Sequence, residues 1–234
     1  MLRVLHRDDH VLVVDKPAGV LSVPGRGAPA PTMWSIVRET APDALPVHRL
    51  DRDTTGVMLF GLGKDAHRAL NQAFESRRAE KTYLALVRGD FATATVCELP
   101  LADGRRGGMR VAAPGEGVGQ PASTAFAPLE RFSAHTLVEC RPKTGRRHQI
   151  RVHLAALGHP LLVDPRYGDA RSVTAEELLP GAGAGEVLAR TPLHAAALRV
   201  AHPTGKGWLQ VESPLPEDLA RCLELLQSAR RRGR

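Results

Sequence analysis

Two hydrophobic periods alternate along this chain of 234 residues, one typical of β-strands and one typical of α-helices. Short runs rich in apolar and β-branched residues, bounded by Gly and Pro, predict strands. The predicted strands, each with its closing turn, are residues 10–19, 56–63, 81–89, 123–132, 134–142, 193–203 and 206–214. Of these, the segments at 123–132 and 134–142 are expected to pair antiparallel, since only a tight turn separates them.

Other segments place apolar residues at helical spacing. The predicted helices are residues 32–40, 64–78, 146–158 and 217–230. In the third of them Ile150 and Leu154 share a face, and Gly158 follows as a C-cap. We expect this helix to begin near Gly145.

Strands outnumber helices and no regular βαβ alternation is present, which favours an α+β fold over a doubly wound one. The predicted architecture is a mixed, mostly antiparallel β-sheet flanked by helices. A chain of this length fits one large domain or a compact two-lobed one. We interpret residues 1–228 as a single domain, because the Gly/Ala segment 179–186 lies between strands that share a sheet, and residues 229–234 as a basic tail.

The composition is that of an ordinary globular protein, with 43% hydrophobic and 24% charged residues. A net charge of +7 favours a polyanionic partner such as nucleic acid, although four arginines in residues 228–234 supply part of the excess. The three cysteines form no CxxC pair, which argues against a disulfide framework and indicates a reducing cytoplasm. We expect no membrane association, since no apolar run approaches the roughly 20 residues of a spanning helix.

Two charged segments carry the candidate chemistry. In HRLDRDTTG, residues 48–56, Asp51 stands between Arg49 and Arg52 immediately before an apolar strand. In RPKTGRRHQIR, residues 141–151, cations crowd the start of a predicted helix, where the macrodipole disfavours them. Phosphate oxygens or the carboxylate of Asp51 would offset this charge, and ordinary surface ion pairs are the alternative.

These segments occur in order with KTYLALVRG, RPKTGRRHQIRVHLAALGHPLLVDPRYG and LHAAALRVAHPTG. In this combination the chain resembles the RluA family of RNA pseudouridine synthases, over residues 8–220. The resemblance implies the pseudouridine synthase fold with a central active-site cleft. It also implies the isomerisation of a specific uridine to pseudouridine in structured RNA, ribosomal RNA or tRNA, without a cofactor.

The resemblance assigns three catalytic roles. Asp51 of the HRLD motif is the catalytic carboxylate, Tyr83 of the K-x-Y motif stacks on the base, and Arg151 of the HQIR motif ion-pairs with Asp51. Physical reasoning agrees, because detaching, turning and reattaching a uracil requires a nucleophile or electrostatic stabiliser, a dry pocket and a stacking surface. Tyr83 taken alone would be an ordinary strand aromatic. Asp53, the other nearby carboxylate, is expected to cap the loop or pair with Arg52.

Several cations are candidate contacts to RNA. They are Arg49, Lys81, Lys143, Arg146 and, as a further polar group, His148. The alternative for Lys143 and Arg146 is that they lie on a solvated face and do not contact the substrate. With few aromatic residues available for stacking, binding is expected to depend on these cations and therefore on salt. His148 and His153 miss the spacing of a helical metal pair, so no metal site is expected.

Many members of the family carry an N-terminal S4-type RNA-binding domain, whereas this chain begins at the predicted catalytic strands. Target selection would then depend on the catalytic domain, with the Gly/Arg-rich hairpin around residues 104–110 and the basic tail. We expect a monomer. The alternatives are an RNA-binding factor without catalysis and a hydrolase of free nucleosides, although glycoside hydrolysis ordinarily uses a second carboxylate.

Overall fold

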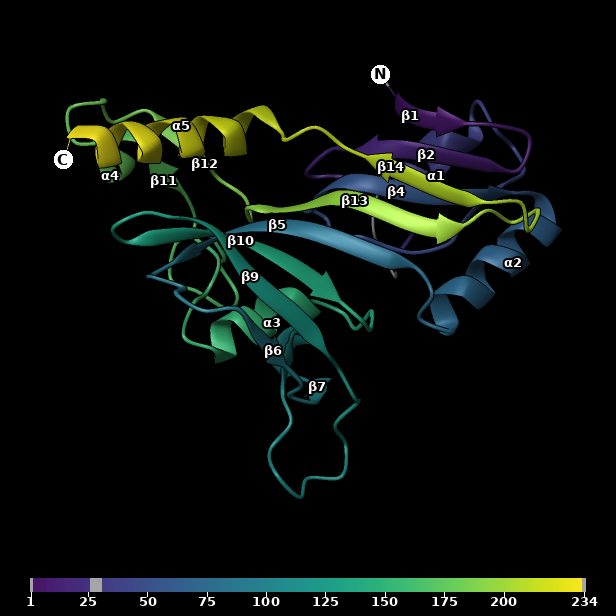
Figure 1. Cartoon of the computed structure of the whole chain (residues 1–234), viewed down its shortest axis with the longest axis horizontal. Helices are drawn as coiled ribbons and strands as arrows, with labels where there is room; N and C mark the ends of the chain where they lie inside the picture. The colour runs from purple at the N-terminus through teal and green to yellow at the C-terminus, as the bar shows by residue number, and fades with distance from the viewer. Residues whose placement is uncertain (1, 26–30, 233–234) are drawn as a thin grey trace. The chain divides into compact units, whose positions relative to one another are not determined.

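The computed structural model describes residues 2–25 and 31–232 (Figure 1). Contacts within the chain group it into two compact units. Unit 1 comprises residues 1–82 and 194–214, and unit 2 comprises residues 83–193 and 215–234. The first boundary falls inside strand β5 (Glu80–Arg88), between Thr82 and Tyr83.

Unit 1 is built on a mixed sheet whose strands run in the order β1-β2-β4-β13 (Figure 1). The strands are β1 (Arg3–Arg7), β2 (Val11–Lys16), β4 (Thr55–Leu62) and β13 (Leu193–Ala201). Two further strands, β14 (Trp208–Glu212) and β3 (Ala44–Pro46), pair with β13 and β4. Among the described residues of this unit, β13 and β4 run parallel, whereas the pairs β1–β2, β2–β4, β3–β4 and β13–β14 are antiparallel. The mixed, mostly antiparallel architecture predicted from the sequence is confirmed.

Two helices of unit 1 follow directly from local sequence. Helix α1 (Met33–Arg38) begins after Thr32, whose hydroxyl accepts a hydrogen bond from the backbone N–H of Ser35 in a capping box. Helix α2 (Gly63–Glu75) buries an apolar stripe that includes Leu70 against the β2 and β4 strands. Both helices were predicted, α2 from its apolar spacing and α1 as a short helix that follows two prolines.

The sheet of unit 2 runs in the order β5-β10-β9-β6, all antiparallel. Its other strands are β6 (Thr95–Cys97), β9 (Thr124–Arg131) and β10 (His135–Pro142), and the predicted β9–β10 pair is confirmed. Neighbouring residues of β10 face opposite sides of the sheet. Leu137 packs in the same cluster as α5 (Glu217–Arg232), while Val138 packs with residues of α3 (Gln149–Ala156). The two helices therefore cover opposite faces.

Short elements complete unit 2. They are β7 (Leu101–Asp103), η1 (Arg105–Gly107), β8 (Met109–Val111), β11 (Val173–Thr174), α4 (Ala175–Leu178) and β12 (Glu186–Leu188). Strands β7 and β8 form the hairpin that the Gly/Arg-rich segment predicted. Strand β1 and the β11–β12 pair were not predicted.

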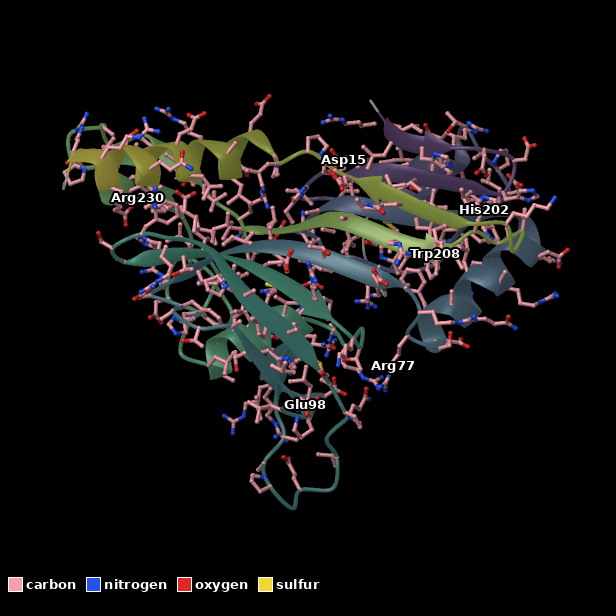
Figure 2. The ribbon with its side chains drawn as sticks, viewed as in Figure 1. Asp15, Arg77, Glu98, His202, Trp208 and Arg230 are labelled. Carbon is pink, nitrogen blue, oxygen red and sulfur yellow. The ribbon has the colours of Figure 1, made fainter. Side chains whose placement is uncertain are left out.

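One sequence-based boundary is wrong. Helix α3 begins at Gln149 and not near Gly145, because His148 adopts a left-handed conformation with φ of 52° and turns the chain just before the helix. At the other end of the chain, α5 continues through Arg232, and the division into residues 1–228 and a basic tail stays a prediction. Arg230, labelled in Figure 2, is ion-paired with Glu130 at 3.1 Å.

No helix among residues 2–25 and 31–232 is both long enough and apolar enough to span a bilayer.

Candidate active site

Asp51 lies in the loop between β3 and β4, and a buried lysine holds the loop next to it. The Nζ of Lys16, whose side chain is fully buried, donates hydrogen bonds to the carbonyl oxygens of Pro17 (2.8 Å), Val20 (2.7 Å) and Arg52 (2.9 Å). A buried ammonium group requires such partners to offset its desolvation. Lys16 thereby connects the turn after β2 to the residue that follows Asp51.

A serine holds the other neighbour of Asp51. The hydroxyl of Ser22 accepts a hydrogen bond from the backbone N–H of Leu50 (2.9 Å) and donates one to the carbonyl oxygen of Leu50 (2.8 Å). Arg52 adds a third connection, because its Nε donates to the carbonyl oxygen of Gly19 at 3.0 Å. The residues on both sides of Asp51 are therefore fixed to the segment 17–22, and the Asp51 side chain itself is half-buried.

The start of β4 anchors the other end of the same loop. Thr55 Oγ1 lies 2.9 Å from Nδ1 of His194 on β13, and Nε2 of His194 lies 3.2 Å from the carbonyl oxygen of Ser213. The next residue, Gly56, has φ of 107°, and a Cβ there would lie 2.2 Å from the carbonyl oxygen of Ala195. Only glycine permits this close approach of β4 to β13.

His48 and Lys81 form a second, less polar environment in unit 1. Nε2 of His48 accepts a hydrogen bond from the backbone N–H of Leu59 (3.0 Å), and its ring stacks on Phe74. Burial, reinforced by the positive charge of Lys81, lowers the pKa of His48 to about 3. Burial also lowers the pKa of Lys81 to about 8. His48 is therefore a neutral structural residue, while Lys81 is a partly desolvated cation two positions before Tyr83.

The remaining predicted residues of the Asp51 loop lie closer to solvent. Arg49 is exposed, as expected for a residue that contacts RNA phosphates, and Asp53 is half-buried.

In unit 2, Tyr83 lies near the start of β5, opposite Cys140 of β10. It is half-buried and packs against the apolar cluster beneath α3, which includes Ile150. An aromatic ring that is supported on one side and partly exposed on the other is suited to stacking on a base.

Arg151 lies in the first turn of α3 and is 8% exposed. Its Nε and Nη2 donate to the two carboxylate oxygens of Asp164, at 2.8 and 2.9 Å. Its guanidinium carbon lies 5.1 Å from the ring centre of Tyr167. Burial alone would raise the pKa of Asp164, but the hydrogen bonds and charge of Arg151 outweigh it and lower that pKa.

His148 connects α3 to the same tyrosine. Nδ1 of His148 lies 2.7 Å from the hydroxyl of Tyr167, which also accepts a hydrogen bond from the backbone N–H of Met109 (2.8 Å). Gln149 holds the preceding turn, since its Oε1 accepts from the backbone N–H of Arg146 (3.0 Å). These contacts hold residues 146–148 outside the helix, which was predicted to begin near Gly145.

The other cations of segment 141–151 differ in their surroundings. Lys143 and Arg146 are exposed, whereas Arg147 is ion-paired with Asp103 of β7 at 2.8 Å. The negative partners expected for this basic segment are thus partly intramolecular, namely Asp103 and Asp164. The predicted pairing of Arg151 with Asp51 joins a residue of unit 2 to one of unit 1, and it stays a prediction.

Comparison with known proteins identifies the family. Residues 10–156 match the family model described as RNA pseudouridylate synthase. "Ribosomal large subunit pseudouridine synthase C" of Salmonella typhi is 40% identical over 230 residues, which cover 96% of this chain and 70% of that protein. "Ribosomal large subunit pseudouridine synthase D" of Xanthomonas campestris is 38% identical over 238 residues, which cover 97% of this chain and 70% of that protein.

Solved structures agree with this match. The structure titled "Human RNA Pseudouridylate Synthase Domain Containing 4" superposes with a TM-score of 0.77 and 25% identity, over 96% of this chain and 93% of that one. A second one, "Human RNA Pseudouridylate Synthase Domain Containing 1", superposes with a TM-score of 0.72 and 28% identity.

The chain belongs to the RluA family of RNA pseudouridine synthases. The fold and the isomerase activity implied by the sequence motifs are confirmed.

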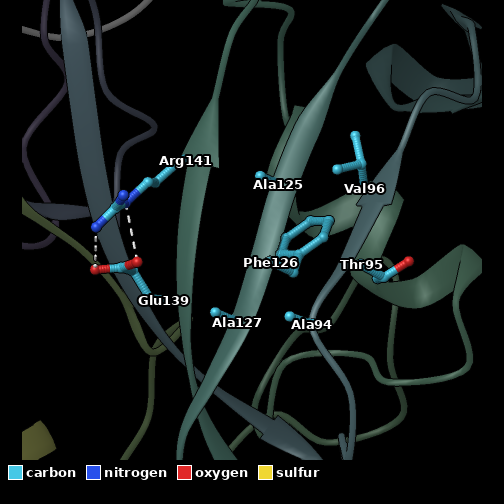
Figure 3. A pocket seen from close by; sticks show the side chains of 8 residues that line it. All are labelled: Ala94, Thr95, Val96, Ala125, Phe126, Ala127, Glu139 and Arg141. Carbon is cyan, nitrogen blue, oxygen red and sulfur yellow. Dashed lines mark hydrogen bonds and ion pairs between the residues drawn. The ribbon is translucent and has the colours of Figure 1, made fainter.

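A shallow groove on unit 2 of the synthase contrasts with the predicted site (Figure 3). Its lining consists of Ala94, Thr95, Val96, Ala125, Phe126, Ala127, Glu139 and Arg141. The single carboxylate in it, Glu139, is ion-paired with Arg141 at 2.9 Å, and the rest of the lining is mostly short and apolar. None of the residues predicted to be catalytic lines this groove.

Sequence reasoning missed four residues that support the predicted site of the synthase. Lys16 and Ser22 hold the Asp51 loop, and Asp164 and Tyr167 hold Arg151. Asp164 and Tyr167 belong to the GHPLLVDPRYG motif, so their presence was visible but their contact with Arg151 was not. The sequence indicated the role of Lys16 less clearly: it is a charged residue that follows the apolar run VLVV after Asp15.

Proposed function

We propose that this synthase isomerises a uridine of large-subunit ribosomal RNA and that Asp51 is its catalytic carboxylate. The observation that carries the role of Asp51 is the fixation of both its neighbours, Leu50 by Ser22 and Arg52 by Lys16. A catalytic group must be held near its productive geometry by contacts outside the reaction itself. The substrate class follows the names of the bacterial relatives.

The isomerisation needs one carboxylate and no added group, since every atom of the uridine is kept. The N1–C1′ bond breaks, the uracil turns, and a bond forms between C5 and C1′. Three routes are consistent with one carboxylate: Asp51 attacks the uracil ring, attacks C1′ of the ribose, or takes a proton from the ribose to give a glycal. The bond that Asp51 forms in either attack breaks again before the product leaves, and in the glycal route the proton returns to the ribose as the C5–C1′ bond forms. In each route the C5 proton is lost last and a proton is gained at N1.

Tyr83 and Arg151 are proposed to act on the same flipped uridine. Tyr83 is half-buried on β5 and offers a ring face for stacking, which contributes about 1–3 kcal/mol per base. Arg151 supplies a permanent positive charge that would keep the carboxylate of Asp51 ionised in a dry site. The exposed Arg49, Lys143 and Arg146, together with Lys81 and His148, are proposed to contact the RNA.

The proposal is tested by mapping pseudouridine across the total RNA of cells with and without the gene. We expect the loss of pseudouridine at one or more positions of large-subunit ribosomal RNA, restored by the wild-type gene and not by an Asp51→Asn variant. Loss confined to tRNA would show that the substrate class is wrong. Restoration by the Asp51→Asn variant would show that the assigned carboxylate is wrong.

A further inference from the structure

The guanidinium of Arg151 is held in unit 2 by two different kinds of contact. Asp164 binds its Nε and Nη2 edge in a bidentate pair, and the ring of Tyr167 lies against it. A bidentate pair fixes the plane of the guanidinium, and a ring close to it restricts movement out of that plane. Together the two contacts leave Arg151 a single orientation.

Each of these two partners is itself held. Oδ1 of Asp164 also accepts hydrogen bonds from the backbone N–H groups of Arg166 (3.0 Å) and Tyr167 (3.1 Å), so this fully buried carboxylate cannot rotate without losing four hydrogen bonds. The hydroxyl of Tyr167 accepts from the N–H of Met109 and lies 2.7 Å from His148. Burial raises the pKa of Tyr167, so the hydroxyl stays protonated and can donate to His148 at neutral pH.

A buried ion pair of this kind is weak evidence of a stabilising role. Desolvation of the two charges offsets most of their attraction, and apolar replacements of similar volume are often neutral for stability. What such a pair supplies is a fixed direction for the arginine. A fixed orientation of the guanidinium is useful only if Arg151 acts on another group.

We propose that Asp164 and Tyr167 are positioning residues of the pseudouridine synthase reaction, acting through Arg151. This inference rests on the proposed role of Arg151 in catalysis. Asp164 fixes the plane of the guanidinium and Tyr167 restricts movement out of that plane, so that the charge of Arg151 is already aligned when the uridine is flipped.

The test is a set of single-turnover rates at saturating RNA, with the dissociation constant for RNA measured on the same preparations. We expect Asp164→Asn to lower the rate by about 10²-fold, the effect typical of a displaced catalytic group. The dissociation constant should stay within about twofold of the wild-type value, because Asp164 is buried. Tyr167→Leu should also lower the rate, and Tyr167→Phe, which keeps the ring, should retain more of it than Tyr167→Leu.

Asp218→Asn is the matched control. Asp218 forms a comparable bidentate pair with Arg190 in unit 2, at 2.6 Å for each bond, and the Arg190 side chain is 9% exposed. This variant should lose stability without losing rate. Equal rate losses in Asp164→Asn and Asp218→Asn that follow their melting temperatures would show that the Asp164 pair is merely structural and would overturn the proposal.

A double-mutant cycle separates this proposal from the one on which it rests. If Asp164 acts through Arg151, Asp164→Asn adds no further loss of rate in an Arg151→Ala background. Additive losses would overturn the positioning role while leaving Arg151 catalytic. A wild-type rate in Arg151→Ala alone would instead overturn the catalytic role of Arg151. If Asp164→Asn does not fold, the Tyr167→Leu and Arg151→Ala pair gives the same cycle.

Discussion

The hydroxyl of Ser22 forms two hydrogen bonds with the backbone of a single residue, Leu50, which immediately precedes Asp51. Ser22 is 3% exposed and Leu50 is 5% exposed, so water does not replace these bonds if the hydroxyl is removed. The backbone next to Asp51, the proposed catalytic carboxylate, is thus held by a side chain 28 residues away from Leu50 in sequence.

Replacing Ser22 with Ala should therefore affect both stability and rate. A buried N–H and a buried carbonyl are left unpaired, and each unpaired group costs about 1–3 kcal/mol in the free energy of unfolding. The single-turnover rate should fall by more than the stability loss explains at temperatures where the variant is folded. Ser133→Ala, at an exposed position between β9 and β10, is the control and should change neither quantity. An Ala variant at position 22 with wild-type rate would mean that the Asp51 loop is fixed by other contacts.

Lys16→Met tests the second connection to the same loop. The substitution keeps most of the volume but leaves three carbonyl oxygens without their donor, and each unpaired group costs about 1–3 kcal/mol. We expect a large drop in the urea midpoint of unfolding. Lys64→Met, at an exposed position of α2, should leave the midpoint nearly unchanged. Similar midpoints for the two variants would contradict the role of Lys16.

The close approach of β4 to β13 predicts a difference between two glycines that both have positive φ. Gly56→Ala would place a Cβ 2.2 Å from the carbonyl oxygen of Ala195, whereas Gly63→Ala, with φ of 78°, meets nothing within 4 Å. Gly63→Ala costs only the strain of a residue with a side chain at positive φ, about 1–2 kcal/mol. Gly56→Ala should be far more destabilising in thermal unfolding. Equal melting temperatures would show that β4 and β13 can separate without cost.

Lys81 predicts a pH dependence with a definite sign. Its pKa is lowered from 10.5 to about 8 in the folded chain, so the unfolded state binds more protons between these two values. The unfavourable contribution of the buried charge, about 3 kcal/mol at most, is fully present below pH 8 and is relieved as the pH rises toward 10.5. Free energies of unfolding measured from pH 7 to 10.5 should therefore show the wild type gaining stability relative to Lys81→Met as the pH rises. A constant difference across this range would exclude a lowered pKa for Lys81.

The elements with strong apolar periodicity could be predicted from the sequence, and those held by individual polar contacts could not. Strands β2 and β4 and helix α2 follow from burial patterns that the sequence displays. Strand β1 has no such pattern, because its residues are exposed or half-buried at the edge of the sheet. The start of α3 was misplaced because the turn before it depends on the side chain of Gln149, which forms a hydrogen bond that no periodicity reveals.

The candidate site shows the same division. The motifs pointed to Asp51, Tyr83 and Arg151, and the excess of positive charge near Arg151 predicted a negative partner. One such partner is Asp164, which lies 13 residues further along the chain and is brought to Arg151 by the loop after α3. The sequence contains this carboxylate, but where it points depends on the hydrogen bonds from Arg151 and from the backbone N–H groups of Arg166 and Tyr167.

The most direct test of the central claim is the single-turnover conversion of uridine to pseudouridine in large-subunit ribosomal RNA by an Asp51→Asn variant. Asn has nearly the same shape as Asp but carries no charge, so the fold and RNA binding should be kept. We predict wild-type melting temperature and RNA affinity with no detectable pseudouridine. Pseudouridine formed by this variant at a rate close to that of the wild type would contradict the assignment of Asp51 as the catalytic carboxylate.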